Sequence, residues 1–403
     1  SARSGIARLE AAVSGVLRRG RDKRRALPAT AAHATRPQPA AAGLRSSDNA
    51  RHETRGRDSA AAPRRSRDFR ATTLHCPPPF LMTQLITDLI TQLIKHITQP
   101  GGGQRMDFSF WPAPPQSFET IVDLARHAEA TGWDGIWYAD HFMPNAEDTT
   151  QPWPEGWTTL TALAMAVPRV RLGTLVLGNT YRHPAVVAKM AATLDHICGG
   201  RLVLGLGAGW QENEHQQYGL PFHDVPGRLE RLDEACAVIT ALFTQTVSNF
   251  EGRHYQLHDA SLEPKPLQKP LPLLIGGGGE KVTLRIAARW ANEWNVWGTP
   301  TTLAHKIAVL AAHCHDLGRD PATIRKSAQA LVFMSEDQAW LQNMRERPMQ
   351  MATLIGTPAE LRDQVAAYAE AGVDELIVPD FTLGAGDAKK RAMDTFLKNV
   401  AGR

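Results

Sequence analysis

The stretch VRLGTLVLGNTYRHP, residues 170–184, decides the fold. An apolar strand ends there in a turn at Gly178 and Asn179, and Pro184 then opens a helix, because proline suits the first helical turn. Residues 195–215, DHICGGRLVLGLGAGWQENEH, repeat this plan with the end of a helix, a short loop, an apolar strand and a glycine-rich exit. The repeated plan predicts strands that alternate with helices.

Strands and helices are expected to alternate in this way from Met106 to the end of the chain. The expected strands cover residues 106–111, 135–140, 170–177, 201–207, 272–276, 293–297, 328–334 and 375–379. The expected helices cover residues 117–131, 157–166, 184–197, 227–243, 280–291, 301–317, 358–371 and 387–400. Eight strands that are each followed by a helix predict a closed (β/α)₈ TIM barrel, and such regular repeats disfavour a doubly wound open sheet. Residues 246–270 read as a hairpin with a connector, and residues 335–356 as a long loop over one barrel end.

Composition divides the 403 residues into three parts. Residues 1–81 are a basic extension rich in Ala, Arg, Ser and Pro, which we expect to be disordered because it cannot bury a core. This extension could be a transit peptide or a translated upstream segment without a role. Residues 82–105 read as an amphipathic helix followed by a glycine linker. This helix could dock on the body, pair with a second copy in a homodimer or lie on a membrane surface, and the last is disfavoured because its polar face is not strongly basic. Residues 106–403 hold the barrel.

Charge and cysteine content limit the classes of partner and the cellular compartment that the sequence suggests. Residues 1–70 carry 17 Lys and Arg against 6 Asp and Glu, so the remaining residues are mildly acidic although the whole chain has a net charge of +4. We therefore predict no nucleic-acid partner. No apolar run reaches the roughly 18 residues of a membrane span. The four cysteines are scattered without a CxxC pair, which fits a reducing, cytoplasmic location and indicates neither a metal site nor a disulfide framework.

An acid and an imidazole, Asp140 and His141, close the second expected strand. In a TIM barrel the active site lies at the C-terminal ends of the strands, where such a pair can orient a ring or move a proton. A surface aspartate that caps a turn and a packed histidine are the alternative. Arg182 and His183, before the next helix, could meet an anion at its N-terminus or form a solvated pair.

The exits of the third, fourth and fifth strands carry ligand-binding candidates. Asn179 and Thr180 can offer hydrogen bonds to a ligand. Glycines let a ligand approach the backbone closely, and the fourth strand leaves through Gly207 and Gly209. Four glycines precede a helix at the fifth strand, as suits a phosphate held by backbone N–H groups: Gly276, Gly277, Gly278 and Gly279.

Residues 106–403 resemble the luciferase-like monooxygenase superfamily, in the branch that uses the deazaflavin coenzyme F420. The matching motifs are GWDGIWYADHFMP (132–144), the stretch quoted first, KMAATLDHICGGRLVLGLGAGW (189–210), FEGRHYQL (250–257), PLLIGGGGEK (272–281) and GTPAELRDQVAAYAEAGVDELIV (356–378). The resemblance implies a (β/α)₈ barrel that holds the cofactor ring at the C-terminal ends of its strands. It also implies a cis peptide bond between Leu175 and Val176.

The resemblance assigns residues to the cofactor. The family's cofactor-contacting acid and histidine match Asp140 and His141, and its third-strand hydroxyl matches Thr180. Its asparagine after the fourth strand matches Asn213, and its phosphate cradle matches the four glycines from Gly276. The sugar-phosphate dehydrogenases of the superfamily differ from this chain at two positions. Trp210 replaces their carboxylate and Asn145 their tryptophan, which argues against a sugar-phosphate substrate.

The main hypothesis is an F420-dependent oxidoreductase that transfers a hydride between the deazaflavin and a small organic substrate. In this hypothesis His141 transfers a proton or polarises the cofactor ring, and Asp140 orients His141 or contacts the cofactor ring. One alternative is a monooxygenase that uses reduced FMN and oxygen, because FMN offers a similar ring and phosphate. The other is a cofactor-binding or scaffold barrel without catalysis.

Overall fold

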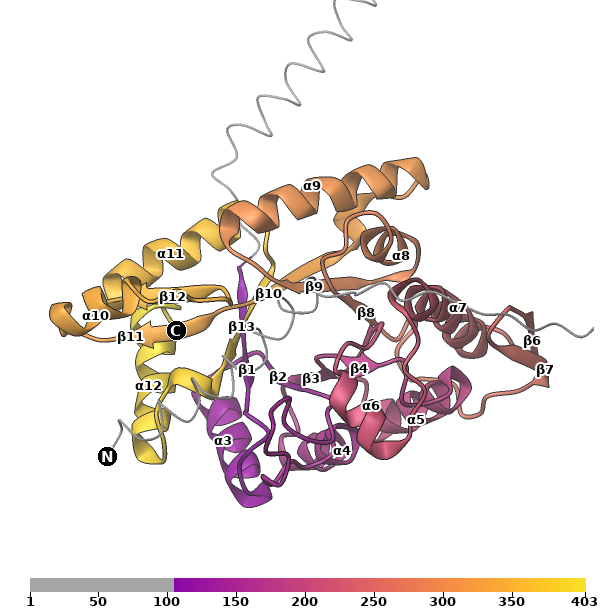
Figure 1. Ribbon diagram of the computed structural model, residues 1–403, viewed down its shortest axis with the longest axis horizontal. Helices are drawn as coiled ribbons and strands as arrows, with labels where there is room; N and C mark the ends of the chain where they lie inside the picture. The colour runs from indigo at the N-terminus through magenta and orange to yellow at the C-terminus, as the bar shows by residue number, and fades with distance from the viewer. Residues whose placement is uncertain (1–104) are drawn as a thin grey trace, which may run out of the picture. The chain divides into compact units, whose positions relative to one another are not determined.

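Eight parallel strands form the centre of the protein in a computed structural model that describes residues 105–403 (Figure 1). They are β1 (Asp107–Trp111), β2 (Gly135–Tyr138), β3 (Arg171–Thr174), β5 (Leu202–Gly207), β8 (Leu273–Gly276), β9 (Glu293–Trp297), β10 (Arg325–Gln329) and β13 (Glu375–Pro379). The pairing of β1 with β13 and of β3 with β5 closes the ring. The predicted (β/α)₈ barrel is therefore confirmed, and the open sheet is excluded.

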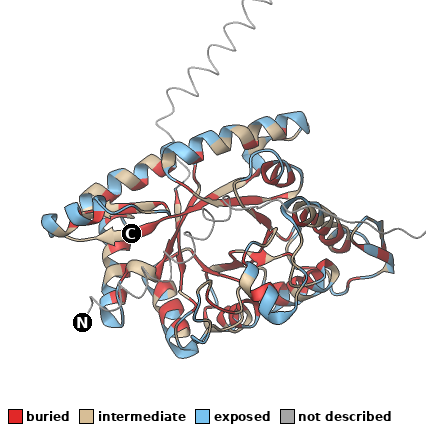
Figure 2. Ribbon diagram, viewed as in Figure 1, coloured by how far each residue is buried: buried red, intermediate tan, exposed pale blue. Residues whose placement is uncertain are grey.

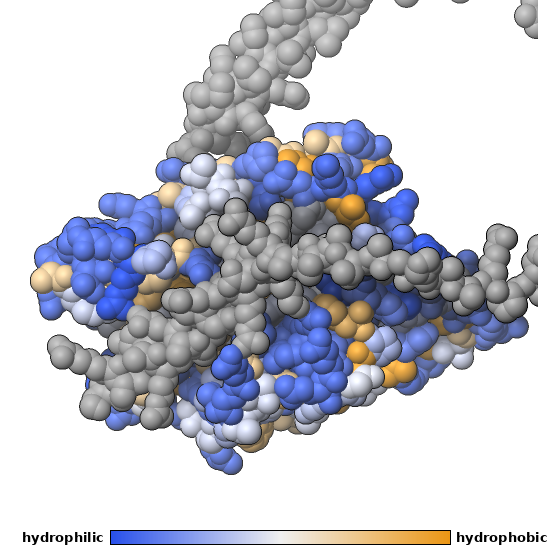
Figure 3. Space-filling view, viewed as in Figure 1, coloured by the Kyte–Doolittle hydropathy of each residue, from blue (hydrophilic) through white to orange (hydrophobic). Residues whose placement is uncertain are grey.

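Helices surround the ring and expose one face each to solvent, while the strands are mostly buried (Figure 2). They are α3 (Phe118–Thr131), α4 (Gly156–Ala166), α5 (Pro184–Ile197), α7 (Val225–Thr244), α8 (Thr283–Trp290), α9 (Pro300–Asp316), α11 (Pro358–Glu370) and α12 (Asp387–Asn399). The visible outer surface of the described residues is mainly hydrophilic (Figure 3). Among residues 105–403, no helix combines the length and apolar character that a bilayer crossing requires.

Local sequence signals set the helix ends. The Ser117 side chain accepts a hydrogen bond from the backbone at the start of α3, and Gly132 ends that helix at φ 99°, which glycine adopts without steric cost. Pro184 lies in the first turn of α5. Thr357 and Glu360 form a capping box that starts α11. These signals are local in the sequence, so the helix positions could be predicted well.

The strand expected at 328–334 was wrong, because its apolar run belongs to a strand outside the ring, whereas the barrel strand before it is mostly polar. The barrel strand β10 ends at Gln329, and β11 (Leu331–Met334) pairs outside the ring with β12 (Thr353–Gly356). The segment 335–356, expected to be a loop, contains α10 (Gln338–Arg345) and β12. The break follows Gln329 because β11 turns away to pack against α10 and β12.

Smaller elements complete the described chain. The expected hairpin is confirmed as β6 (Ser248–Glu251) and β7 (Gln256–Ala260). The short helix α6 (Glu212–Tyr218) after β5 was not predicted. The short strand β4 (Leu177–Gly178) and the 3₁₀ turns η1 (Pro321–Thr323) and η2 (Asp380–Thr382) complete the set. The expected disordered segment 1–81 lies outside the described residues, and so does 82–105 apart from Arg105.

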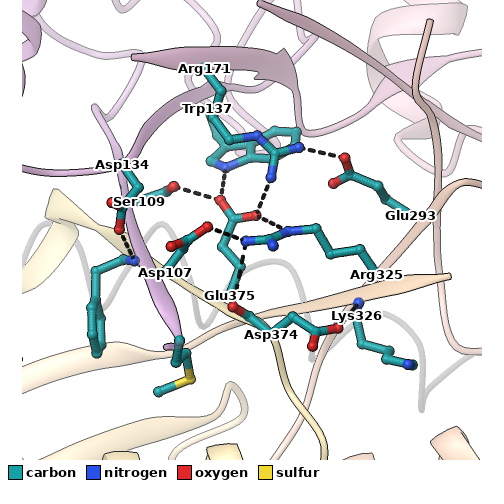
Figure 4. A network of polar contacts seen from close by, with 12 residues as sticks. Asp107, Ser109, Asp134, Trp137, Arg171, Glu293, Arg325, Lys326, Asp374 and Glu375 are labelled. Atoms are coloured by element: carbon teal, nitrogen blue, oxygen red, sulfur yellow. Dashed lines mark hydrogen bonds and ion pairs between the residues drawn. The ribbon is translucent and has the colours of Figure 1, made fainter. Parts of the chain in front are cut away.

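A network of charged side chains fills the N-terminal end of the barrel (Figure 4). The buried Glu375 carboxylate accepts hydrogen bonds from the Trp137 indole at 2.8 Å and from Arg171 at 3.1 Å, and it pairs with Arg325 at 3.4 Å. Arg171 also binds Glu293 at 2.5 Å. Burial opposes ionisation of Glu375, but Arg171 and Arg325 outweigh it and lower the pKa of this carboxyl. Burial raises the pKa of Glu293. This end of a TIM barrel serves stability rather than catalysis.

Above this network the barrel interior holds a small polar group and an apolar cluster. The Asn295 amide donates to the Ser327 hydroxyl at 2.9 Å and accepts from the Gln329 amide at 2.7 Å. The buried apolar cluster consists of Trp111, Trp137, Ala139, Leu175, Val203, Leu274 and Ile377, against which Val176, Trp297 and Phe381 pack. The cluster runs from the network to the C-terminal ends of the strands. It therefore forms the floor of the end at which the predicted site residues lie.

Candidate active site

Asp140 lies just beyond β2 and is only 1% exposed. Its two carboxylate oxygens accept hydrogen bonds from the Arg182 guanidinium at 2.8 and 3.0 Å, and the Gly178 amide donates to Oδ2 at 3.2 Å. Burial raises the pKa of Asp140, and Arg182 opposes this. Burial tends to lower the pKa of Arg182, but Asp140 and Glu155, which also binds the guanidinium, raise it. Arg182 thus binds protein carboxylates rather than an anion at the start of α5, and Asp140 ties β2 to β4.

His141 lies beside Asp140 and is held by a different carboxylate. Its Nδ1 lies 2.9 Å from Oε1 of Glu214, which is 0% exposed. The Tyr181 hydroxyl donates to the same Oε1, and the Phe142 amide donates to Oε2 at 2.8 Å. Burial and the neighbouring Glu214 raise the pKa of Tyr181, so its hydroxyl stays a donor. Within residues 105–403, the Nε2 atom of His141 has no hydrogen-bond partner.

Trp210 covers part of His141 from the exit of β5. Its ring meets the imidazole edge to face, with 5.4 Å between the ring centroids, and 58% of the residue is exposed. An exposed indole beside an imidazole offers an apolar surface to a ligand. The position at which the sugar-phosphate dehydrogenases carry an acid therefore has no charge in this chain.

The peptide bond between Leu175 and Val176 is cis, as the family resemblance implies. The Val176 side chain lies against three glycines of the neighbouring strands. A Cβ atom added at Gly205, Gly207 or Gly276 would lie 3.1, 2.8 or 2.9 Å from its nearest Cγ atom. Gly207 and Gly276 therefore make room for Val176, which the sequence alone did not reveal.

Thr180 and Gly209 meet at the exit of β4 and β5. The Thr180 hydroxyl lies 2.7 Å from Nε2 of His215, and Nδ1 of His215 lies 2.6 Å from the Gln211 carbonyl. Gly209 has φ +79°, and a Cβ atom there would lie 2.6 Å from the Thr180 Oγ1 atom. Because a carbonyl only accepts, Nδ1 of His215 carries a proton, and in the neutral imidazole Thr180 is the donor to Nε2. Thr180 thus belongs to a fixed polar chain.

The two asparagines expected to bind the cofactor lie in different surroundings. Asn179 is buried, and its amide donates to the Tyr255 hydroxyl at 3.3 Å. Asn213 donates to the Pro144 carbonyl at 2.9 Å, while its own Oδ1 is buried without a partner in residues 105–403. An unpaired buried acceptor costs free energy, so Asn213 is suited to accept a hydrogen bond from a ligand.

The glycine-rich exit of β8 is a turn rather than the immediate start of a helix. The Gly277 amide donates to the Asn295 carbonyl at 2.9 Å, and Lys306 donates to the Gly278 carbonyl at 2.7 Å. In the described chain the amides of Gly278 and Gly279 have no acceptor. The helix expected from 280 begins only at Thr283. Lys306 also pairs with the Glu280 carboxylate at 3.1 Å. Free amides beside a lysine suit a phosphate, and the cradle expected there stays a prediction.

Glu214 and Tyr181 are the site residues that the sequence analysis missed. His141 and Glu214 lie 73 positions apart, so no local pattern connects them. Glu214 is in α6, the helix that was not predicted. Because its neighbours in the sequence are polar, the segment is typical of an exposed surface. No cluster of His, Cys, Asp and Glu that could hold a metal lies within residues 105–403.

Comparison with known proteins identifies the family. The chain matches the luciferase-like monooxygenase family over residues 97–351. It is 35% identical over 330 residues to the F420-dependent glucose-6-phosphate dehydrogenase of Intrasporangium calvum, with 72% of this chain and 96% of that protein covered. The chain belongs to the luciferase-like monooxygenase family.

Other similar proteins also use F420. An F420-dependent glucose-6-phosphate dehydrogenase of Amycolatopsis mediterranei is 37% identical over 164 residues, which cover 40% of this chain and 48% of that protein. The match thus spans about half the length of that relative. An F420-dependent secondary alcohol dehydrogenase, solved with an F420-acetone adduct, superposes with a TM-score of 0.65 at 21% identity, over 74% of this chain and 99% of the other. At that identity the superposition supports the luciferase-like fold.

Proposed function

We propose that this luciferase-like protein is an F420-dependent oxidoreductase that transfers a hydride between the deazaflavin and a small organic substrate. One observation carries the proposal. The C-terminal end of the barrel presents His141 with a free Nε2 atom, together with free amides at Gly278 and Gly279. The first group can move a proton and the second can bind a phosphate. The similarity to F420-dependent dehydrogenases supports the choice of cofactor.

In the proposed reaction each group of residues in this chain would have a distinct role. The amides of Gly278 and Gly279 bind the cofactor phosphate. The backbone around Leu175 and Val176 supports the ring, with Asn179, Thr180, Gly207, Gly209, Asn213, Gly276 and Gly277 around it. The bound deazaflavin supplies the hydride chemistry. His141 accepts the proton of an alcohol at Nε2, or returns one to a ketone, while Asp140 keeps β2 and β4 in place.

The substrate class follows from the mouth of the site. Trp210 presents an exposed indole beside His141, where the sugar-phosphate dehydrogenases carry a carboxylate. Asn145 replaces their tryptophan. These two replacements support an uncharged organic alcohol or ketone rather than a sugar phosphate. A homodimer in the cytoplasm is part of the proposal, and the free, buried Cys198, Cys236 and Cys314 are compatible with a reducing compartment.

A tryptophan-fluorescence titration of the full chain with F420 and, separately, with FMN tests the cofactor. We expect quenching at lower concentrations of F420. Preferential FMN binding, with turnover that requires oxygen, would favour the monooxygenase alternative. The match to the luciferase-like monooxygenase family supports this alternative. A folded His141→Ala variant should bind F420 and lose turnover, whereas full turnover would remove His141 from the mechanism. Binding without turnover of any alcohol or ketone would favour a scaffold.

A further inference from the structure

Glu214 is a buried carboxylate with three hydrogen-bond donors, and the proposed reaction gives it no role so far. The donors are Nδ1 of His141 at 2.9 Å, the Phe142 amide at 2.8 Å and the Tyr181 hydroxyl. The carboxylate is 0% exposed, so water does not screen these contacts. No Arg or Lys side chain of residues 105–403 forms an ion pair with it. Its charge is therefore stabilised by these three groups.

We propose that Glu214 is a positioning residue that fixes the tautomer of His141, an inference that rests on the proposed function. A carboxylate oxygen only accepts hydrogen bonds, so the Nδ1 atom that faces it must carry the proton. In the neutral imidazole the lone pair is then on Nε2, the atom without a protein partner. Glu214 thus makes Nε2 the atom that accepts the substrate proton, and its negative charge stabilises the imidazolium that forms.

The surrounding groups support this assignment. The elements that meet His141 contribute these charged or titratable groups: Asp140 after β2, Tyr181 and Arg182 after β4, Glu155 before α4, and Glu214 and His215 of α6. Asp140 and Glu155 are paired with Arg182. His215 is held by Gln211 and Thr180. Glu214 is thus the one carboxylate among these groups that contacts the His141 ring.

The variant Glu214→Gln tests the tautomer directly because an amide has one acceptor and one donor group. If its oxygen accepts from the Phe142 amide, its NH₂ group faces Tyr181 and His141. Every contact is then satisfied only when His141 accepts at Nδ1 and carries its proton on Nε2. The reverse orientation places two donors, the NH₂ group and the Phe142 amide, against each other. The substitution should therefore move the proton from Nδ1 to Nε2.

The experiment uses the full chain labelled with ¹⁵N-histidine, and long-range ¹H–¹⁵N NMR spectra above about pH 8, where ordinary histidines are neutral. The His141→Ala variant identifies the signals. We expect Nδ1 protonated in the wild type, the same in Tyr181→Phe, and Nε2 protonated in Glu214→Gln. A wild-type protein with its proton on Nε2, or a Glu214→Gln variant with the wild-type tautomer, would overturn the proposal.

Kinetics provides the second measurement. Glu214→Gln should lower kcat about 10²-fold with KM within about twofold, because proton transfer is affected rather than binding. Tyr181→Phe, the matched control, removes a hydrogen bond from the same carboxylate oxygen and should lower kcat less than about fivefold. An equal loss in both variants would mean that Glu214 only stabilises the fold. The NMR result does not depend on the cofactor, so it separates a failure of this proposal from a failure of the F420 assignment.

Discussion

A methyl group added at Gly207 tests whether the glycines at the strand ends exist to accommodate Val176. The added Cβ atom would lie 2.8 Å from Cγ2 of Val176. Carbon atoms in contact are about 3.5–4.0 Å apart, so the valine would have to retreat by roughly 0.7 Å or more. It has little room, because a Cβ at Gly276 or Gly205 would also lie within 3.1 Å of a Val176 Cγ atom. Overpacking of this kind costs about 1–3 kcal/mol, which is the expected loss for Gly207→Ala.

A double-mutant cycle with Val176→Ala isolates the contact. Shortening Val176 removes both Cγ atoms, so Gly207→Ala should cost at least about 1 kcal/mol less in the Val176→Ala background. Urea unfolding, followed by tryptophan fluorescence, measures all four free energies of unfolding. The F420 titration of the same proteins should show weaker binding for Gly207→Ala and recovery in the double variant. Losses that add to within about 0.5 kcal/mol would refute the reasoning.

Further substitutions test the two barrel ends. Glu375→Ala removes the buried carboxylate that Arg171 and Arg325 share and should cost about 3–5 kcal/mol in urea unfolding; a loss below about 1 kcal/mol would contradict the network. The folded-state pKa of Glu375 is lowered, so the ionised carboxylate stabilises the protein above the ordinary glutamate pKa of 4.5. This stabilisation is lost as the pH falls towards the folded-state pKa. Glu375→Gln should therefore flatten the acid side of a plot of Tm against pH. Arg182→Met leaves the buried Asp140 carboxylate without its ion-pair partner and should lower the free energy of unfolding by a similar amount. Adding Asp140→Asn should recover part of that loss in the same unfolding assay. Trp210→Ala should raise KM for uncharged alcohols about tenfold with kcat changed less than threefold, whereas an unchanged KM would exclude the indole from the substrate site.

The barrel could be predicted because its signals are local. Apolar runs, proline after a strand and glycine after a helix each act within a few residues, and they place seven of the eight barrel strands and the eight helices around them to within a few positions. The error at 328–334 has a physical cause. Ala330 separates the mostly polar barrel strand β10 from the apolar β11, and only pairing with a segment more than twenty positions away shows that β11 leaves the ring.

The candidate site was predicted in part. Strand ends led to Asp140 and His141, because a barrel collects such residues at one end. The partners of those side chains could not be predicted, since Arg182 and Glu214 reach them from 42 and 73 positions away. The crowding of Gly207 against Val176 was hidden for the same reason. Register and side-chain direction decide such contacts, and a single sequence carries little information on either.

The two ends of the barrel use carboxylates differently, and the difference indicates where a proton can move. At the N-terminal end, Glu375 is balanced by guanidinium groups, which keep their protons at any pH that the protein survives. Asp140 at the opposite end is balanced in the same way by Arg182. Among the buried carboxylates of the described chain that take several hydrogen bonds, Glu214 differs because its ionisable partners are an imidazole and a phenol. An imidazole can accept a proton at one nitrogen while the other stays hydrogen-bonded, so the pair of Glu214 and His141 is where the described barrel can couple a buried charge to proton transfer.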